Sequence, residues 1–248
     1  MRNKDFALIT GASEGFGKAL ALECAARNMN LVLVALPGSG LSSLSCYIER
    51  NFNVTTYCLE HDLSKKEECY DLFNEINRLQ IQVNTLINNA GIYGGYPQAA
   101  LDASIDQFKA AYDANVYGVV RVTQAFIDLL KKSSTPRIVN VSSSQGSITL
   151  HSDPSYKYYD YKGVVYLSSK SAMNMYTVVL AYDLKDSNFK INAVCPGYTK
   201  TDFNGHRGPG SVEDAGIRIL KYALLDKDGP TGKFFSEENN PETFEIPW

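Results

Sequence analysis

Short apolar runs alternate with segments of helical periodicity along the whole chain, and no other feature restricts the possible folds as much. Seven runs are long enough for one strand each: residues 6–10, 31–35, 54–58, 83–87, 137–141, 190–195 and 232–235. Helices are expected between them, at 15–27, 41–51, 64–79, 105–130, 162–184 and 211–224, and Ser64 and Glu67 predict a capping box on the third. Because repeated strand–helix units pack as a parallel sheet with helices on both faces, we expect an α/β fold with a doubly wound sheet of about seven strands.

Length and charge favour one domain with a small-molecule partner. The chain has 248 residues and no linker or low-complexity tract, so a single domain over 1–248 is expected. Its net charge of -3 argues against nucleic acid and membrane surfaces as partners. The polar first residues and the lack of a long apolar run predict neither a signal peptide nor a membrane span. Five scattered cysteines are expected as free thiols of a cytoplasmic protein, and no Cys/His cluster predicts a metal site.

The first predicted turn has glycines where a bound phosphate would need them. It reads Thr10-Gly11-Ala12-Ser13-Glu14-Gly15-Phe16-Gly17, between a strand and a helix. Glycines let the backbone approach a phosphate closely, and a helix N-terminus supplies free N–H groups and a partial positive charge. The turn therefore predicts a dinucleotide site, although a GxxxGxG turn can also serve packing alone.

Six further motifs follow in order along the chain: Asp62-Leu63, Asn88-Asn89-Ala90-Gly91, Asn115 in Asn115-Val-Tyr-Gly118, Ser142-Ser143-Ser144, Tyr166-Leu-Ser-Ser-Lys170 and Pro196-Gly197-Tyr-Thr-Lys-Thr201. With the glycine turn, they resemble the short-chain dehydrogenases/reductases of the TGxxxGxG type. The resemblance implies a Rossmann-type fold, an NAD(P) cofactor and a small carbonyl or alcohol substrate. It implies a catalytic set of Asn115, Ser143, Tyr166 and Lys170. It also implies cofactor contacts from Gly11, Ser13, Glu14, Gly15, Phe16, Gly17, Asp62, Leu63, Asn89, Ala90, Gly91, Tyr166, Lys170, Pro196, Gly197, Thr199 and Thr201.

The chemistry of the Tyr–Lys pair can be argued from the residues themselves. Tyr166 and Lys170 are four apart on a predicted helix and share one face. A nearby Lys⁺ and an oxidised nicotinamide would lower the tyrosine pKa, which is ordinarily about 10. Tyr166 could then exchange a proton with a substrate oxygen, which a serine hydroxyl would hold. Lys170 is the only charged residue from Gly163 to Tyr182, and a buried lysine needs a partner or a purpose. The resemblance gives Asn115 the role of anchoring a water in a proton relay.

Two assignments have competitors within the chain. Tyr158 and Lys162 also form a YxxxK pair, but their surroundings predict a loop, so Tyr166 is favoured. The resemblance favours Ser143 as the acting serine, with Ser142 and Ser144 as alternatives.

Ser143 and Tyr166 are 23 residues apart, about twice the usual spacing in the family. The extra segment, at about 147–164, resembles the insertion of monomeric carbonyl reductases and carries a cluster of tyrosines: Tyr156, Tyr158, Tyr159 and Tyr161. We expect these tyrosines to cover an apolar helix face with their hydroxyls toward water, which predicts a monomer. The chain end, from Leu224 to Phe235 with Ile246-Pro247-Trp248, resembles the same branch.

The sequence indicates less clearly whether the adenosine ribose of the cofactor carries a 2′-hydroxyl, as in NAD, or a 2′-phosphate, as in NADP. An NAD enzyme usually carries an acid at the end of the second strand, and Leu36 stands there. Leu36 and Glu14 also occupy positions where an NADP enzyme often has Arg or Lys. Neutral donors are available from Ser39, Ser42 and Ser43. The missing acid and the carbonyl-reductase resemblance favour NADP(H), with NAD(H) as the alternative.

The combined motifs predict an oxidoreductase that interconverts a carbonyl and an alcohol, with reduction of a ketone, aldehyde or quinone as the expected direction. Two alternatives stay open: a regulatory protein that binds NADP(H) without turnover, and a sugar or steroid alcohol dehydrogenase of the same family.

Overall fold

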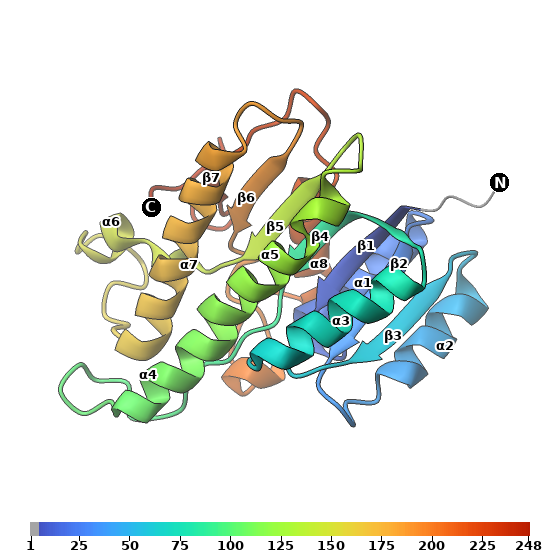
Figure 1. Ribbon diagram of the computed structural model, residues 1–248. Helices are drawn as coiled ribbons and strands as arrows, with labels where there is room; N and C mark the ends of the chain where they lie inside the picture. The colour runs from blue at the N-terminus through green and yellow to red at the C-terminus, as the bar shows by residue number, and fades with distance from the viewer. Residues whose placement is uncertain (1–4) are drawn as a thin grey trace.

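Seven parallel strands form one sheet in the computed structural model, which describes residues 5–248. Along the chain they are β1 (Asp5–Thr10), β2 (Asn30–Ala35), β3 (Thr56–Glu60), β4 (Gln82–Asn88), β5 (Arg137–Val141), β6 (Lys190–Val194) and β7 (Lys233–Phe235). Across the sheet the order is β3-β2-β1-β4-β5-β6-β7 (Figure 1). The predicted doubly wound α/β fold is confirmed. Residues 1–4 of the expected single domain lie outside the described part of the chain.

Helices cover both faces of the sheet (Figure 1). One face carries α1 (Gly15–Ala26), α2 (Leu41–Asn51) and α8 (Val212–Ala223), whose apolar side chains share one core cluster with the strands. The other carries α3 (Lys66–Arg78), α5 (Gly118–Leu130) and α7 (Val164–Asp183), which contribute to a second cluster. The short α4 (Ile105–Tyr112) leads toward α5, and α6 (Ile148–His151) lies in the insertion. Because both faces are covered, β2 is buried along its whole length, and all its residues after Asn30 are apolar.

Three local expectations differ from the structure. Strand β3 lies at Thr56–Glu60, two residues later than 54–58. The capping box on α3 does not form, because the Ser64 hydroxyl donates to Asp62 Oδ1 at 2.6 Å and the helix begins later, with Lys65 as its N-cap. The helix expected at 105–130 is interrupted by a π-helical turn at Asp113–Tyr117.

The strand order reverses between β1 and β4, and this reversal places the ligand site. The chain adds β2 and β3 on one side of β1 and β4 to β7 on the other. The carboxyl ends of β1 and β4 therefore meet at a switch point, where open α/β sheets bind ligands. Among the described helices none is long and apolar enough to cross a bilayer. All five cysteines are free.

Candidate active site

The glycine turn packs backbone against backbone at the switch point. A Cβ on Gly11, whose φ is +65°, would lie 2.8 Å from Ala90 Cα. A Cβ on Gly17 would lie 2.0 Å from the Gly11 carbonyl oxygen. Side chains are therefore excluded at both positions, and the turn after β1 is held close to the turn after β4.

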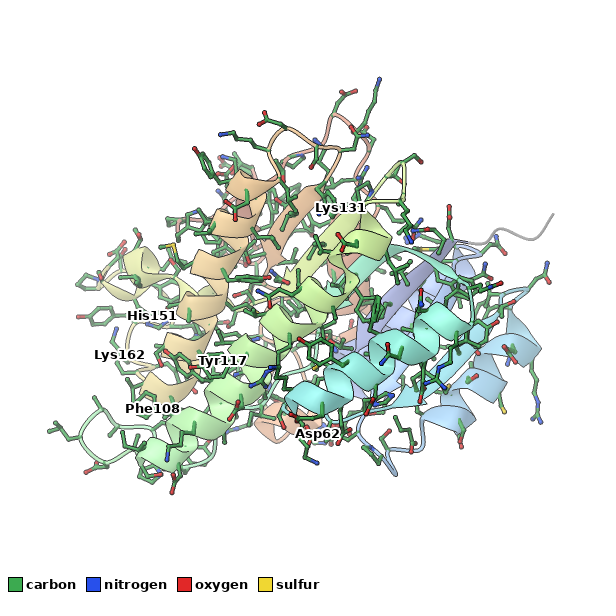
Figure 2. The ribbon with its side chains drawn as sticks, viewed as in Figure 1. Asp62, Phe108, Tyr117, Lys131, His151 and Lys162 are labelled. Carbon is green, nitrogen blue, oxygen red and sulfur yellow. The ribbon has the colours of Figure 1, made fainter. Side chains whose placement is uncertain are left out.

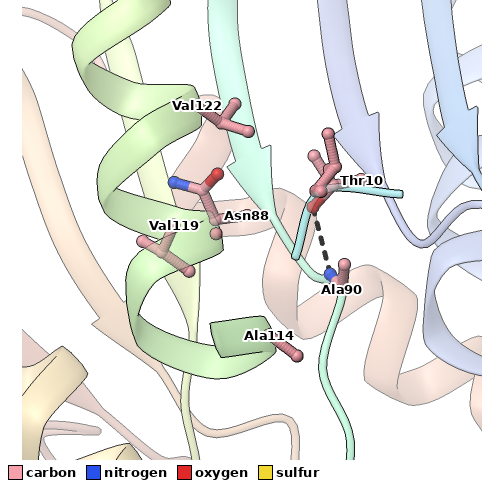
Figure 3. Close-up of a pocket in the computed structure, with 8 residues that line it drawn as sticks. Thr10, Asn88, Ala90, Ala114, Val119 and Val122 are labelled. Atoms are coloured by element: carbon pink, nitrogen blue, oxygen red, sulfur yellow. Dashed lines mark hydrogen bonds between the residues drawn. The ribbon is translucent and has the colours of Figure 1, made fainter. Parts of the chain in front are cut away.

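Thr10 connects the same two turns through its side chain. Its Oγ1 accepts a hydrogen bond from the backbone N–H of Ala90 at 3.0 Å (Figure 3). It also accepts one from the backbone N–H of Asn89 at 3.0 Å. Asn89 Nδ2 in turn donates to the carbonyls of Thr10 and Gly11. Sequence reasoning missed Thr10, whose one signal was its place before the first glycine. Beneath this junction lies a small, mostly apolar cavity lined by Thr10, Leu63, Asn88, Ala90, Ala114, Gly118, Val119 and Val122.

The N-terminus of α1 keeps its backbone donors available to an anion. Its N-cap, Glu14, is exposed and makes no side-chain cap hydrogen bond. The partly buried Phe16 side chain packs against the core. A Cβ on Gly15 would meet only the Thr201 methyl, at 3.8 Å, which brings the Pro196–Thr201 turn to the glycine turn. This glycine-walled cradle fits the pyrophosphate of a dinucleotide.

Asn115 lies in the π-helical turn and is completely buried. Its Nδ2 donates to the Ile92 carbonyl and to Ser169 Oγ, each at 2.9 Å, and its Oδ1 accepts from Ile92 N–H at 2.7 Å. Both amide hydrogens are used within the protein, so the side chain has only acceptor capacity for the water expected there. In the structure, the Asn115 side chain holds the segment after Gly91 in place through its hydrogen bonds to Ile92.

The three serines after β5 have different partners. Ser142 Oγ pairs with Asn174 Oδ1 at 2.6 Å, and Ser144 Oγ accepts from the Tyr156 hydroxyl at 2.8 Å. The Ser143 hydroxyl accepts from Gln145 N–H at 3.2 Å, and its interaction with the Tyr166 side chain lowers the pKa of that phenol. Ser143 is therefore the serine of the three that faces Tyr166.

Tyr166 and Lys170 lie on α7 near the start of that helix. The Lys170 ammonium donates to the Val141 carbonyl at 2.8 Å and lies 5.7 Å from the Tyr166 ring centre. Gln98 Oε1, missed by sequence reasoning, accepts from the backbone N–H groups of Val165 and Tyr166 and so fixes the start of the helix. The lysine is 4% exposed, as its isolated position on an apolar helix suggested.

Burial sets the protonation of both groups in the free protein. Burial raises the pKa of Tyr166, an effect that the Ser143 hydrogen bond only partly offsets. Burial lowers the pKa of Lys170 to about 8. The expected lowering of the Tyr166 pKa requires a bound oxidised nicotinamide as well as Lys170, and in the free protein desolvation by burial is the largest effect on this pKa. Tyr166 is a neutral phenol at pH 7, which suits a proton donor.

The second YxxxK pair, Tyr158 and Lys162, does not come together as a site. Lys162 lies beside His151 (Figure 2), and its Nζ donates to the His151 carbonyl at 2.8 Å. The same Nζ lies 3.8 Å from the Tyr159 ring centre. The Tyr158 hydroxyl donates to the Glu238 carboxylate. Tyr158 and Lys162 thus have separate partners, in a segment of turns rather than a helix.

Three tyrosines of the cluster direct their hydroxyls to partners at the active site and the chain end. The hydroxyls of Tyr156, Tyr158 and Tyr161 bond Ser144, Glu238 and Tyr93 respectively, so they do not simply point to water as expected. The C-terminal segment also anchors the insertion, since Ser147 Oγ donates to the Pro247 carbonyl and Thr149 Oγ1 to that of Trp248.

The catalytic tyrosine expected from the sequence has aromatic neighbours from two loops. The Tyr93 ring stacks on Tyr166 with centroids 5.7 Å apart, and Phe203 contacts it at 5.5 Å. Arg207 donates to the Tyr96 hydroxyl at 3.4 Å, which joins the 198–210 loop to the 92–98 loop. Apolar rings therefore border the space where a substrate would meet Tyr166.

An acid that the sequence pattern did not indicate lies beside the loop after β2. Glu60, at the end of β3, accepts a hydrogen bond from Gly38 N–H at 3.1 Å. Leu36 is exposed, and the nearby Ser39 hydroxyl is buried without a partner among the described residues. Asp62 is held by Ser64, whose hydrogen bonds lower the pKa of the Asp62 carboxyl.

The fold and the site together define a class, the nicotinamide-dependent oxidoreductases built on a Rossmann-type sheet. The family model described as short chain dehydrogenase matches residues 5–211. The chain therefore belongs to the short-chain dehydrogenases/reductases, a family that binds a nicotinamide cofactor and acts on alcohol and ketone groups.

Individual relatives are similar over nearly the whole chain. The short-chain dehydrogenase anuI of Penicillium roqueforti is 31% identical over 243 residues, which is 95% of each chain. A (+)-neomenthol dehydrogenase of Arabidopsis thaliana is 30% identical over 291 residues, covering 96% of this chain and 97% of that one. The NADPH-bound carbonyl reductase from chicken fatty liver superposes with a TM-score of 0.81 over 100% of both chains, at 21% identity.

Proposed function

We propose that this protein reduces the carbonyl of a small ketone, aldehyde or quinone to an alcohol, using NADPH. The observation that carries the proposal is the grouping of Ser143, Tyr166 and Lys170 beside the glycine cradle at the switch point of the sheet. Tyr166 is a neutral phenol in this environment and has a proton to give. The similarity to a neomenthol dehydrogenase and a carbonyl reductase supports the same chemistry.

In this mechanism the chain positions a carbonyl oxygen and supplies its proton. The nicotinamide, when bound, supplies the hydride. Ser143 donates a hydrogen bond to the carbonyl oxygen and stabilises its developing negative charge. Tyr166 gives its phenolic proton to the same oxygen. Lys170, charged below about pH 8, stabilises the resulting phenolate, and Asn115 keeps the loop after Gly91 in register with both.

NADP(H) is proposed over NAD(H) because Leu36 replaces the acid that usually binds the ribose 2′-hydroxyl. The unpartnered Ser39 hydroxyl offers a neutral donor to a 2′-phosphate. Glu60 opposes this choice, although its carboxylate is engaged by Gly38 N–H. Dissociation constants for NADPH and NADH in wild type and Glu60→Gln test the proposal. If wild type binds NADH more tightly than NADPH and Glu60→Gln reverses that order, Glu60 selects NAD(H) and the proposal of NADP(H) is overturned.

The remaining expectations belong with this proposal: one domain, a cytoplasmic protein and a monomer. A panel of ketones, aldehydes, quinones and alcohols, followed by NAD(P)H absorbance, tests the activity. Turnover of a carbonyl is the expected result. Cofactor binding without any turnover would favour a regulatory NADP(H)-binding protein, and turnover of sugars or steroid alcohols alone would favour a dehydrogenase.

A further inference from the structure

Glu238 joins three segments that are far apart in the sequence. It lies in a turn after β7, and its side chain is 21% exposed. Its Oε2 accepts from the backbone N–H of Tyr198 at 2.7 Å. Its Oε1 accepts from Lys157 Nζ at 2.7 Å and from the Tyr158 hydroxyl. One carboxylate thus connects the chain end, the insertion and the turn after β6.

The turn after β6 is held from two sides. Gly197 has a φ of +95°, and a Cβ there would lie 2.8 Å from Arg218 Nη1 and 3.0 Å from Glu238 Oε2. Arg218 also donates to the Pro196 carbonyl at 2.9 Å. The guanidinium and the carboxylate therefore fix the start of this turn, and Thr201 at its other end touches the glycine cradle. Two residues further on, the Phe203 ring contacts the Tyr166 ring at 5.5 Å. The turn thus leads from the cradle to the expected proton donor, which is the side of the site where the nicotinamide would lie.

The surroundings keep the Glu238 carboxylate ionised. Burial raises the pKa of Glu238, but hydrogen bonds from Lys157, Tyr158 and Tyr198 N–H outweigh it, so the pKa is lowered. Burial and the same carboxylate raise the pKa of Tyr158, which stays a neutral donor. The insertion thus supplies two donors that orient a charged acceptor toward Tyr198.

We propose that Glu238 is a positioning residue that sets the Pro196–Thr201 turn against the nicotinamide half of the cofactor, acting through the Tyr198 N–H. The inference rests on the proposed function, because it concerns the same site. It gives the insertion a role in cofactor binding: Lys157 and Tyr158 hold the carboxylate that holds the turn.

The test compares two ligands that differ by the nicotinamide. Dissociation constants for NADPH and for 2′-phospho-ADP-ribose are measured by calorimetry on the full chain, with NADH and ADP-ribose in parallel. In Glu238→Gln we expect NADPH to bind about tenfold more weakly, the loss typical of a hydrogen bond to a charged group, while 2′-phospho-ADP-ribose binds within about twofold of wild type. Tyr158→Phe should give the same selective loss at about threefold. Glu245→Gln is the matched control, since this exposed acid of the same segment pairs with Lys233 and should change neither constant.

The inference is overturned if Glu238→Gln binds NADPH and 2′-phospho-ADP-ribose equally more weakly, or binds both as wild type does. A residue that only stabilises the fold would not affect the nicotinamide half selectively. If Glu238→Gln does not fold, as judged by thermal unfolding, Tyr158→Phe decides in the same way. A wild type that binds no dinucleotide overturns the proposed function as well. A wild type that binds both ligands without turning over carbonyls overturns the proposed activity alone, and the ratio of the two constants still judges Glu238.

Discussion

Lys170 is the single charged residue on the first four turns of α7, and its burial sets its pKa. Burial brings the pKa of Lys170 down to about 8, so its proton is lost near that pH in the folded protein. The ammonium is expected to support the phenolate formed when Tyr166 gives up its proton. The reduction rate, as kcat/KM, should therefore fall as pH rises through about 8, and absorbance assays from about pH 6 to about pH 10 measure it. Lys162→Met, which removes an exposed lysine of the insertion, should leave the midpoint unchanged. A profile that stays flat to about pH 10 would contradict the assignment.

The two YxxxK tyrosines should respond differently to loss of the hydroxyl. Tyr166→Phe removes the proton donor, and general acid catalysis contributes about a hundredfold to ten-thousandfold. Turnover should fall by that factor, measured by NADPH absorbance at saturating cofactor. Tyr158→Phe breaks a hydrogen bond to Glu238 and should keep most of the turnover under the same conditions. The opposite ranking would move the proton donor to the insertion.

Sequence reasoning reached these residues unequally, and the reason is the distance of their partners along the chain. Tyr166 and Lys170 were predictable because four residues on a helix define one face. The serine could not be singled out from the residues, since the partners of Ser142 and Ser144 lie 32 and 12 residues away. Glu238 carries no local signal, because its partners lie 40 to 81 residues away.

At the scale of elements, α7 depends on a side chain from another segment. Gln98 is buried and its Oε1 accepts from two backbone N–H groups in the first turn of α7. Gln98→Ala leaves these groups without that acceptor, which should cost about 1 to 2 kcal/mol of the free energy of unfolding, measured in urea. Because Tyr166 is one of the two donors, kcat should also fall. Gln124→Ala, on an exposed position of α5, is the control and should change neither quantity. An unchanged unfolding free energy in Gln98→Ala would show that this cap is dispensable.

The misplaced element boundaries have local physical causes. The π-helical turn at Asp113–Tyr117 has ordinary helical periodicity, so a continuous helix over 105–130 was the only prediction available. It forms where the buried Asn115 amide bonds both backbone groups of Ile92, a contact across 23 residues. The start of α3 moved because Ser64 bonds Asp62 rather than the helix. A pattern of apolar residues does not predict such polar hydrogen bonds, and so it misplaces the helix boundaries that depend on them.

At the scale of the whole molecule, the strand–helix alternation predicted the architecture well because each strand must be buried on both faces. Six of the seven strands begin and end within one residue of the predicted runs, and β3 is shifted by two residues. The contacts of the insertion were not predictable, since it packs on the chain end nearly 100 residues later. Its polar and aromatic composition was compatible with several surfaces.

The expected monomer now needs a different physical reason, because the tyrosine cluster leaves the second half of α7 uncovered. Met175, Val179 and Tyr182 are 63%, 48% and 65% exposed on that helix. Three side chains form a strip much smaller than the roughly 800 Å² per partner that a stable interface buries. Lys185 lies 3.9 Å from the Tyr182 ring centre and places a charge at its end. We therefore expect light scattering after size exclusion to give 27.4 kDa at micromolar concentration. A stable dimer would contradict this, and its dissociation by Val179→Glu would locate the interface on α7.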